Sequence, residues 1–177
     1  MENKLKQWIE AAYSNAAKKG FHDRVTTDRL LLCLVLTELM ECVEAHRCGN
    51  HATIKDDPDQ MADFHEWFED EVKDTVEDEL ADTVIRLCDL AGLRGIDIDP
   101  ILYKPCGEVP EAEFPEQLFW IAQVICNEIL PTSTIVNCAI ARIEVVAYLN
   151  GIDLHRHIDL KMRYNLSRPP MHGGKRY

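Results

Sequence analysis

The sequence predicts an all-α protein whose core is a four-helix bundle. The strongly periodic segments of the 177-residue chain place apolar side chains three or four positions apart, which is the spacing of one helix face. No segment shows the sustained alternation of apolar and polar residues that indicates a half-buried strand. Prolines and glycines separate the periodic segments where helices are expected to begin and end. We therefore expect one helical domain over residues 1–177.

Local signals mark where these helices begin and end. Thr26, Thr27 and Asp28 offer N-cap oxygens for the second helix, and Thr132 or Ser133 offers one for the fifth. Glycines follow the first, second, third and fifth helices, as is common at helix C-termini. In chain order, the helices are expected over residues 3–19, 28–47, 59–95, 115–130, 133–150 and 153–163.

The third of these helices is expected to be the longest. Asp57-Pro58-Asp59 opens it, and its apolar stripe continues almost to Gly95, so we predict one long helix, straight or kinked. Residues 96–115 hold four prolines and are expected to form the connection to the fourth helix. Pro115 suits the first turn of that fourth helix.

A short internal similarity suggests that the bundle consists of two helical hairpins. Residues 93–98 resemble residues 149–154, and each segment closes a long apolar helix. If the two segments are aligned, Glu79 falls on Ile135 and Asp82 on Cys138. The hairpin over about residues 27–95 would then be the catalytic one, and the hairpin over about 115–150 a structural copy without its acids. A short helix and a basic tail over 153–177 complete the expected domain.

The composition restricts the classes of partner. A net charge of −12 argues against binding to a nucleic-acid backbone, which calls for a basic surface. No run of about 18 uncharged apolar residues is present, so we expect no membrane span and no membrane partner. The N-terminal segment is amphipathic and lacks the apolar core of a signal peptide. The odd number of seven cysteines, mostly on apolar helix faces, fits reduced thiols in a cytoplasmic protein.

Two pairs of acids occur within apolar helical segments. Glu38 and Glu41 lie three apart in the second helix, and Glu79 and Asp82 repeat that spacing in the third. Residues three apart share a helix face, so each pair points in one direction. A carboxylate buried beside aliphatic side chains needs a positive partner. Magnesium, with manganese as an alternative, prefers oxygen ligands of this kind, so the four acids predict a metal site.

Three motifs carry a resemblance to a known family. Residues 38–45 are similar to an E-x-x-E-l-x-E-A stretch, residues 79–87 to an E-L-A-D-v-l-i-x-L stretch, and residues 161–175 to a K-x-x-Y-N-x-x-R-P-x-x-H-G-x-K ending. Together they resemble the all-α nucleoside triphosphate pyrophosphohydrolases, the MazG and dimeric dUTPase-like superfamily. The resemblance covers residues 27–95 and the tail well, and residues 96–150 poorly.

The resemblance implies that the protein cleaves an NTP or dNTP between the α and β phosphates, giving the monophosphate and pyrophosphate. The four acids would hold magnesium, and one glutamate, for which we choose Glu41, would take a proton from the attacking water. Arg86 would orient Asp82. A nucleotide is the implied small-molecule partner, and a homodimer is the expected assembly. The residues implied to bind phosphate are Lys161, Asn165, Arg168 and Lys175.

A helical chain rich in acids also has rival interpretations. Di-iron carboxylate bundles use Glu-x-x-His pairs, and none of the seven histidines here has an acid three residues before it. The alternative that stays open is a non-catalytic helical module that binds nucleotide or another protein. The base and sugar preference of a nucleotide substrate does not follow from the sequence.

Overall fold

The computed structural model describes residues 2–54, 58–98 and 109–174, and every regular element in these ranges is helical. The predicted all-α bundle is therefore confirmed. The 3-10 helix η1 covers Pro58–Gln60. The α-helices are α1 (Glu2–Lys18), α2 (Asp28–Arg47), α3 (Phe64–Glu71), α4 (Val76–Arg94), α5 (Phe114–Ile125), α6 (Thr132–Leu149), α7 (Leu154–Ser167) and α8 (Met171–Gly174).

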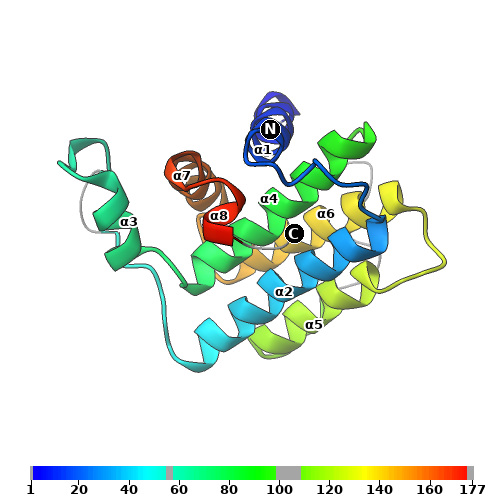
Figure 1. Ribbon diagram of the computed structural model, residues 1–177. Helices are drawn as coiled ribbons and strands as arrows, with labels where there is room; N and C mark the ends of the chain where they lie inside the picture. The colour runs from blue at the N-terminus through cyan, green and yellow to red at the C-terminus, as the bar shows by residue number, and fades with distance from the viewer. Residues whose placement is uncertain (1, 55–57, 99–108, 175–177) are drawn as a thin grey trace.

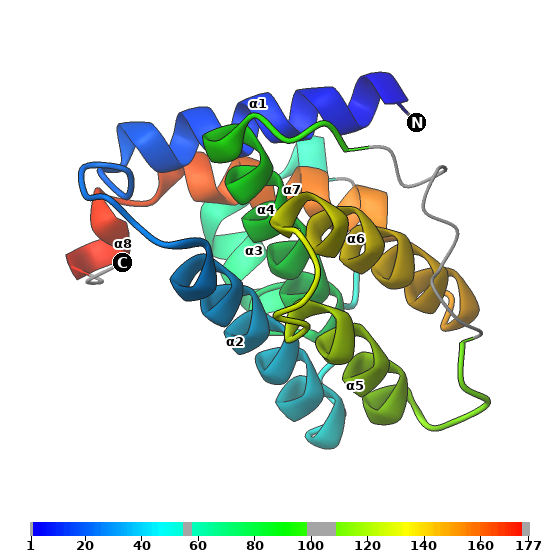
Figure 2. The ribbon, with the colours of Figure 1, turned by 90° about the vertical axis from the view of Figure 1, so that its right-hand side faces the viewer.

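Helix α4 lies at the centre of the molecule. On one side, α2, α5 and α6 join it in a four-helix core, and on the other side α1 and α7 pack across it. Figure 1 shows α3 standing away from this core, on the far side of α7, and in Figure 2 α3 is seen behind α4. The arrangement leaves one side of the α2–α4 pair facing α1 and α7, and the candidate site lies there.

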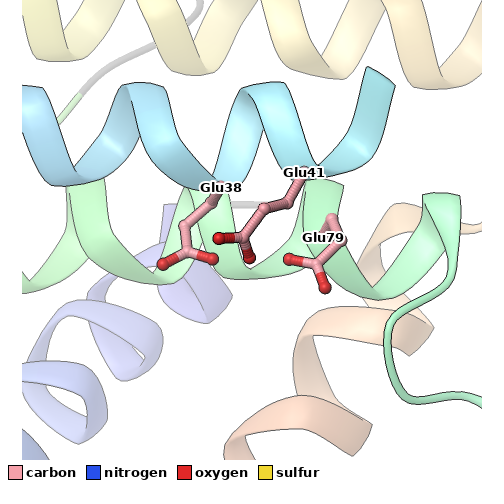
Figure 3. A group of neighbouring side chains, drawn as sticks. All are labelled: Glu38, Glu41 and Glu79. Atoms are coloured by element: carbon pink, nitrogen blue, oxygen red, sulfur yellow. The ribbon is translucent and has the colours of Figure 1, made fainter. Parts of the chain in front are cut away.

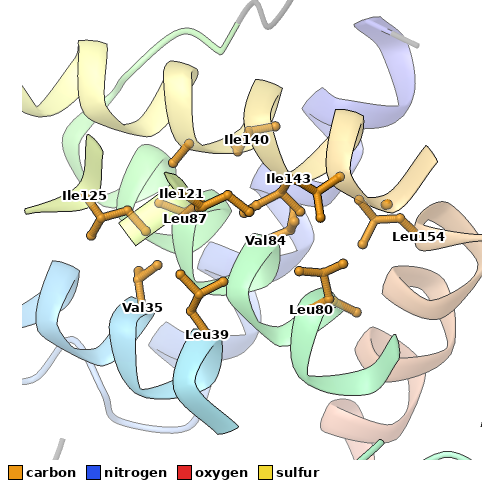
Figure 4. Packing of buried hydrophobic residues seen from close by; sticks show 14 of the residues in the cluster. Val35, Leu39, Leu80, Val84, Leu87, Ile121, Ile125, Ile140, Ile143 and Leu154 are labelled. Carbon is orange, nitrogen blue, oxygen red and sulfur yellow. The ribbon is translucent and has the colours of Figure 1, made fainter. Parts of the chain in front are cut away.

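Aliphatic side chains from several helices fill the core (Figure 4). Val35 and Leu39 of α2 are fully buried against Leu80 and Leu87 of α4. Burial of each such side chain contributes about 1.5–3 kcal/mol to folding. The same cluster includes Ile121 and Ile125 of α5, Ile140 and Ile143 of α6, and Leu154 of α7.

The single long helix predicted over residues 59–95 is wrong, because the chain forms two helices there. α3 ends at Glu71, and Asp74 has a left-handed backbone with φ 61°. The Thr75 hydroxyl then accepts a hydrogen bond from the Asp78 N–H at 3.3 Å and caps α4. The apolar stripe continues through both helices because α3 packs against α7, whereas α4 packs in the main core.

The other helix ends differ from the predicted ones by a few residues. Thr27 caps α2 as expected, and Pro115 lies in the first turn of α5. Pro131, rather than Thr132 or Ser133, occupies the N-cap position of α6. α7 continues to Ser167, four residues beyond the predicted end, because its last turns still bury Tyr164 and Asn165.

Helix α6 is long and apolar enough to cross a membrane, judged by length and composition alone. Its 18 residues have a mean hydropathy of 1.3, and 61% of them are buried inside the protein. α6 packs against α4 and α5, and a buried core helix passes the same test. This helix is therefore weak evidence for a membrane span.

Gly92 allows the close approach of α1 to α4. A Cβ atom at this position would lie 2.6 Å from Cβ of Tyr13. We expect Gly92→Ala to lower the free energy of unfolding by about 1–3 kcal/mol through overpacking, although alanine has the higher helix propensity. Urea denaturation measures the change, and Tyr13→Ala in the same chain should restore part of it. A Gly92→Ala variant as stable as the parent would contradict this packing.

Candidate active site

Three of the four predicted carboxylates meet between α2 and α4. One carboxylate oxygen each from Glu38, Glu41 and Glu79 forms a group whose atoms all lie within 4.8 Å of one another. Figure 3 shows the three side chains converging from the two helices. Glu38 and Glu41 share a helix face, and α2 packs along α4, so that Glu79 lies opposite them. Glu38 and Glu79 are each 5% exposed, whereas Glu41 is exposed.

Asp82, the fourth predicted acid, has a different partner. Its carboxylate lies 3.0 Å from Nζ of Lys161, and it is not part of the group of three. Burial acts to raise the pKa of Asp82, but the charges of Lys161 and Arg86 outweigh it and hold that pKa below its ordinary value. The surroundings of Asp82 therefore favour its ionised form, one helical turn from Glu79.

The two buried glutamates of the cluster, Glu38 and Glu79, lie in surroundings that disfavour their ionised form. Burial raises the pKa of Glu79 to about 9, and the neighbouring acids Asp78, Asp82 and Glu38 add to this effect, while Lys161 opposes it. Burial also raises the pKa of Glu38, and the charge of Asp82 adds to it, against the opposing charge of Arg86. Negative charge is thus concentrated here beyond what the nearby cations neutralise.

The chemistry of this cluster fits a hard divalent cation. All of its donor atoms are carboxylate oxygens, which magnesium and manganese prefer. A cation bound there would favour the ionised form of Glu38 and Glu79, which burial disfavours. A second group of acids, Asp74, Asp78 and Glu79, also lies within 4.8 Å and shares Glu79 with the first.

The raised pKa of Glu79 predicts how stability depends on pH. The carboxyl ionises with a pKa of 4.5 in the unfolded chain and about 9 in the folded one, so between these values the unfolded state binds fewer protons. Stability of the metal-free protein should therefore fall as the pH rises through this window. Magnesium favours the ionised acids and should raise the melting temperature more at about pH 8 than at about pH 6. Thermal unfolding with EDTA or magnesium tests both statements, and a stability that rises with pH would contradict them.

The four residues predicted to bind phosphate have different surroundings. Lys161 is 4% exposed, and its Nζ lies 2.6 Å from Asp78 and 3.0 Å from Asp82, so its charge is already met by two carboxylates. Asn165 is buried, and its amide oxygen accepts a weak hydrogen bond from Arg168 at 3.4 Å. Lys161, Asn165 and Arg168 all line one cavity. Lys175 lies outside the described residues.

Arg86 was expected to orient Asp82, but its guanidinium forms its ion pair with Glu38. The two residues come from adjacent helices, and the arginine side chain is 30% exposed. Its charge still acts on Asp82, because it contributes to the low pKa of that carboxyl. Arg86 therefore joins α4 to the first acid of the cluster.

The acids line a cavity of about 340 Å³ between α1, α2, α4 and α7. This volume is within the range of small-ligand pockets. Apolar side chains, among them Phe21, Leu34 and Ile85, form part of its wall. Its charged and polar lining residues are Asn15, His22, Thr26, Glu38, Glu41, Lys73, Asp74, Glu79, Asp82, Arg86, Asp89, Lys161, Tyr164, Asn165 and Arg168.

Several of these lining residues were missed by the sequence motifs. Lys73 lies in the turn between α3 and α4, which we predicted to be helical. Asn15 comes from α1, where a polar residue between Ala12 and Ala16 on one apolar face was the available signal. Asp89 could have been found from its spacing, because it lies two turns after Asp82 on the same face of α4.

Comparison of the chain with protein-family models, with curated proteins and with solved structures found no match.

Proposed function

We propose that the protein is a metal-dependent nucleoside triphosphate pyrophosphohydrolase, which cleaves an NTP or dNTP to the monophosphate and pyrophosphate. The observation that carries this proposal is the convergence of Glu38, Glu41 and Glu79 within 4.8 Å on the wall of a cavity of about 340 Å³. The motif resemblance adds the reaction class. A buried cluster of acids beside cationic side chains is the arrangement that a metal–triphosphate complex requires.

Glu38 and Glu79, with Glu41 on the open side of the cluster, would hold magnesium, and Asp82 would add its negative charge one helical turn from Glu79. When bound, magnesium neutralises the charge that develops on the phosphate oxygens during displacement. Lys161 holds Asp82 in its ionised form, and Arg86 fixes the carboxylate of Glu38. These two cations therefore keep the acids in place before the substrate arrives.

Glu41 is the best placed general base. It is exposed, and among the residues that the structure describes it makes no hydrogen bond or ion pair through its side chain. Its carboxylate can therefore accept a proton from a water in the cavity, which a carboxylate already paired with an arginine does less readily. The proton would pass from the attacking water to a carboxylate oxygen of Glu41.

Arg168 and Lys73 are the cations best placed to bind phosphate. Arg168 lines the cavity, and in the described part of the chain its guanidinium lies 3.4 Å from the Asn165 amide oxygen and 5.8 Å from the centre of the Tyr164 ring. Its planar guanidinium can bind two phosphate oxygens at once. Lys73 also lines the cavity, from the α3–α4 turn; its side chain is 36% exposed, and its Nζ lies 2.9 Å from the carboxylate of Asp74.

Pyrophosphate release tests the proposal. A panel of NTPs and dNTPs is incubated with magnesium or manganese, and again with EDTA. We expect release from at least one nucleotide, no release with EDTA, and no release from the double variant Glu38→Gln/Asp82→Asn, which should still give a helical circular dichroism spectrum. Turnover that the double variant retains would overturn the proposal.

The ion pair between Arg86 and Glu38 favours one alternative, in which the acids serve the structure and the cavity binds nucleotide without turnover. In that case nucleotide should bind equally well in magnesium and in EDTA. Binding that requires magnesium would exclude it.

A further inference from the structure

A histidine–aspartate pair lines the cavity away from the acidic cluster. His22 follows α1, and its Nε2 lies 2.9 and 3.2 Å from the two carboxylate oxygens of Asp89 on α4. Neither residue belongs to the predicted motifs. His22 is 12% exposed and Asp89 is 20% exposed, so the pair is largely buried but open to the cavity.

The position of Asp89 along α4 matches the length of a nucleotide. Asp82, Arg86 and Asp89 lie on one face of the helix, and all three line the cavity. A helix rises about 1.5 Å per residue, which puts Asp89 roughly 10 Å along the axis from Asp82. A phosphate group bound beside Asp82 would therefore leave the base of the same nucleotide near Asp89.

The pair has hydrogen-bonding capacity that the protein does not use. Nδ1 of His22 is buried and has no hydrogen-bond partner in the described part of the chain. Nε2 of His22 faces both carboxylate oxygens of Asp89, at 2.9 Å from Oδ1 and 3.2 Å from Oδ2, and so holds the carboxylate in one orientation, while its oxygens keep lone pairs for a further donor. Buried polar atoms without a partner are uncommon and costly, and a bound ligand is one way in which they are satisfied.

The walls around the pair suit a flat aromatic ring. Phe21, Leu31, Leu34, Ile85 and Leu93 line the same cavity with apolar surface. Asn15 adds an amide, which can both donate and accept. This mixture of apolar walls and a few fixed polar groups is typical of a small-molecule site.

We propose that Asp89, oriented by His22, accepts a hydrogen bond from the exocyclic amino group of the nucleobase. An ionised carboxylate offers only acceptors, so it pairs with the amino groups of adenine, cytosine and guanine. Uracil and thymine carry carbonyl oxygens in place of an amino group. Only their ring N3–H could donate to the carboxylate, and the carbonyl oxygens on either side of it would then face the carboxylate with like polarity. The substrates are therefore nucleotides of amino-bearing bases. This inference rests on the function proposed for the site.

Binding of analogues that resist hydrolysis tests the inference independently of turnover. The probes are the α,β-imido triphosphates of the ribo- and deoxyribonucleosides of adenine, cytosine, guanine and uracil, titrated calorimetrically in magnesium. The parent protein should bind at least one amino-bearing analogue about tenfold more tightly than the uracil analogue of the same sugar, which is the discrimination that one good hydrogen-bond pair gives. Asp89→Asn should reduce this ratio about tenfold, because the amide can turn a donor toward the base.

Asp70→Asn is the matched control, since Asp70 is exposed on α3 and does not line the cavity. It should leave the ratio unchanged. Equal binding of the uracil analogue by the parent protein, or an unchanged ratio in Asp89→Asn, would overturn the inference. If the analogues bind with the expected ratio while natural nucleotides release no pyrophosphate, the proposed function fails and the base preference stands. If no analogue binds, both proposals are wrong.

Discussion

Replacing Glu79 with glutamine is expected to abolish pyrophosphate release and, at the same time, to stabilise the metal-free protein. The side chain is 5% exposed, and burial raises its pKa to about 9. Near neutral pH this carboxyl is therefore protonated in the folded protein and ionised in the unfolded chain, and this difference lowers the free energy of unfolding. Glutamine has nearly the same shape and carries no charge, so it removes that cost but is a poor ligand for magnesium.

The two effects have opposite signs, and this makes the test specific. Activity should fall at least about 100-fold, as is usual when a metal site is disrupted. The free energy of unfolding in EDTA should rise by about 1–3 kcal/mol. Magnesium should stabilise the parent protein and not the variant. Glu66→Gln, at an exposed position on α3, should change neither quantity. A Glu79→Gln variant that is less stable than the parent in EDTA would contradict the claim that the buried Glu79 carboxyl destabilises the metal-free protein.

Replacing Lys161 with methionine is expected to cause the largest loss of stability in the protein. Lys161 is 4% exposed and Asp78 is fully buried, and Nζ lies 2.6 Å from Asp78 and 3.0 Å from Asp82. Burial opposes the charge of Lys161, but Asp82 and Asp78 outweigh it and raise the pKa of the ammonium above its ordinary value. Removing one partner of such a pair leaves buried charge unmet and costs about 3–5 kcal/mol.

Urea denaturation measures this loss, and two further variants interpret it. The double variant Lys161→Met/Asp78→Asn removes one of the two aspartate charges that Lys161→Met leaves without a partner, and it should recover part of the stability. Lys18→Met, at the exposed end of α1, should cost less than about 1 kcal/mol. If Lys161→Met were as stable as the parent, the ammonium would not be holding the two aspartates in the folded protein.

The sequence predicted those parts of the site that depend on helix geometry alone. Glu38 and Glu41 share a face because they are three apart on an uninterrupted helix, and packing of α2 along α4 brings Glu79 to them. The turn at Asp74 could not be predicted, because the apolar stripe continues unbroken from α3 into α4. Only the tertiary structure shows that the stripe serves two different cores.

Long-range contacts account for the rest of what the sequence did not reveal. Lys161 belongs to a motif that resembles a phosphate-binding segment, yet its nearest partners are acids on α4, 83 residues earlier for Asp78. His22 and Asp89 are 67 residues apart and carry no local pattern that links them. Such pairs depend on how α1 and α7 lie across α4, which periodicity does not specify.

The measurement that tests the proposed function most directly is phosphorus NMR of the reaction products. The nucleotide that turns over fastest is incubated with the protein and magnesium, and the phosphate resonances are followed with time. We expect the nucleoside monophosphate and pyrophosphate to appear together, with no diphosphate, and no change when EDTA is present. Formation of the nucleoside diphosphate and inorganic phosphate would place the cleavage at the β–γ bond, and would contradict the proposed reaction.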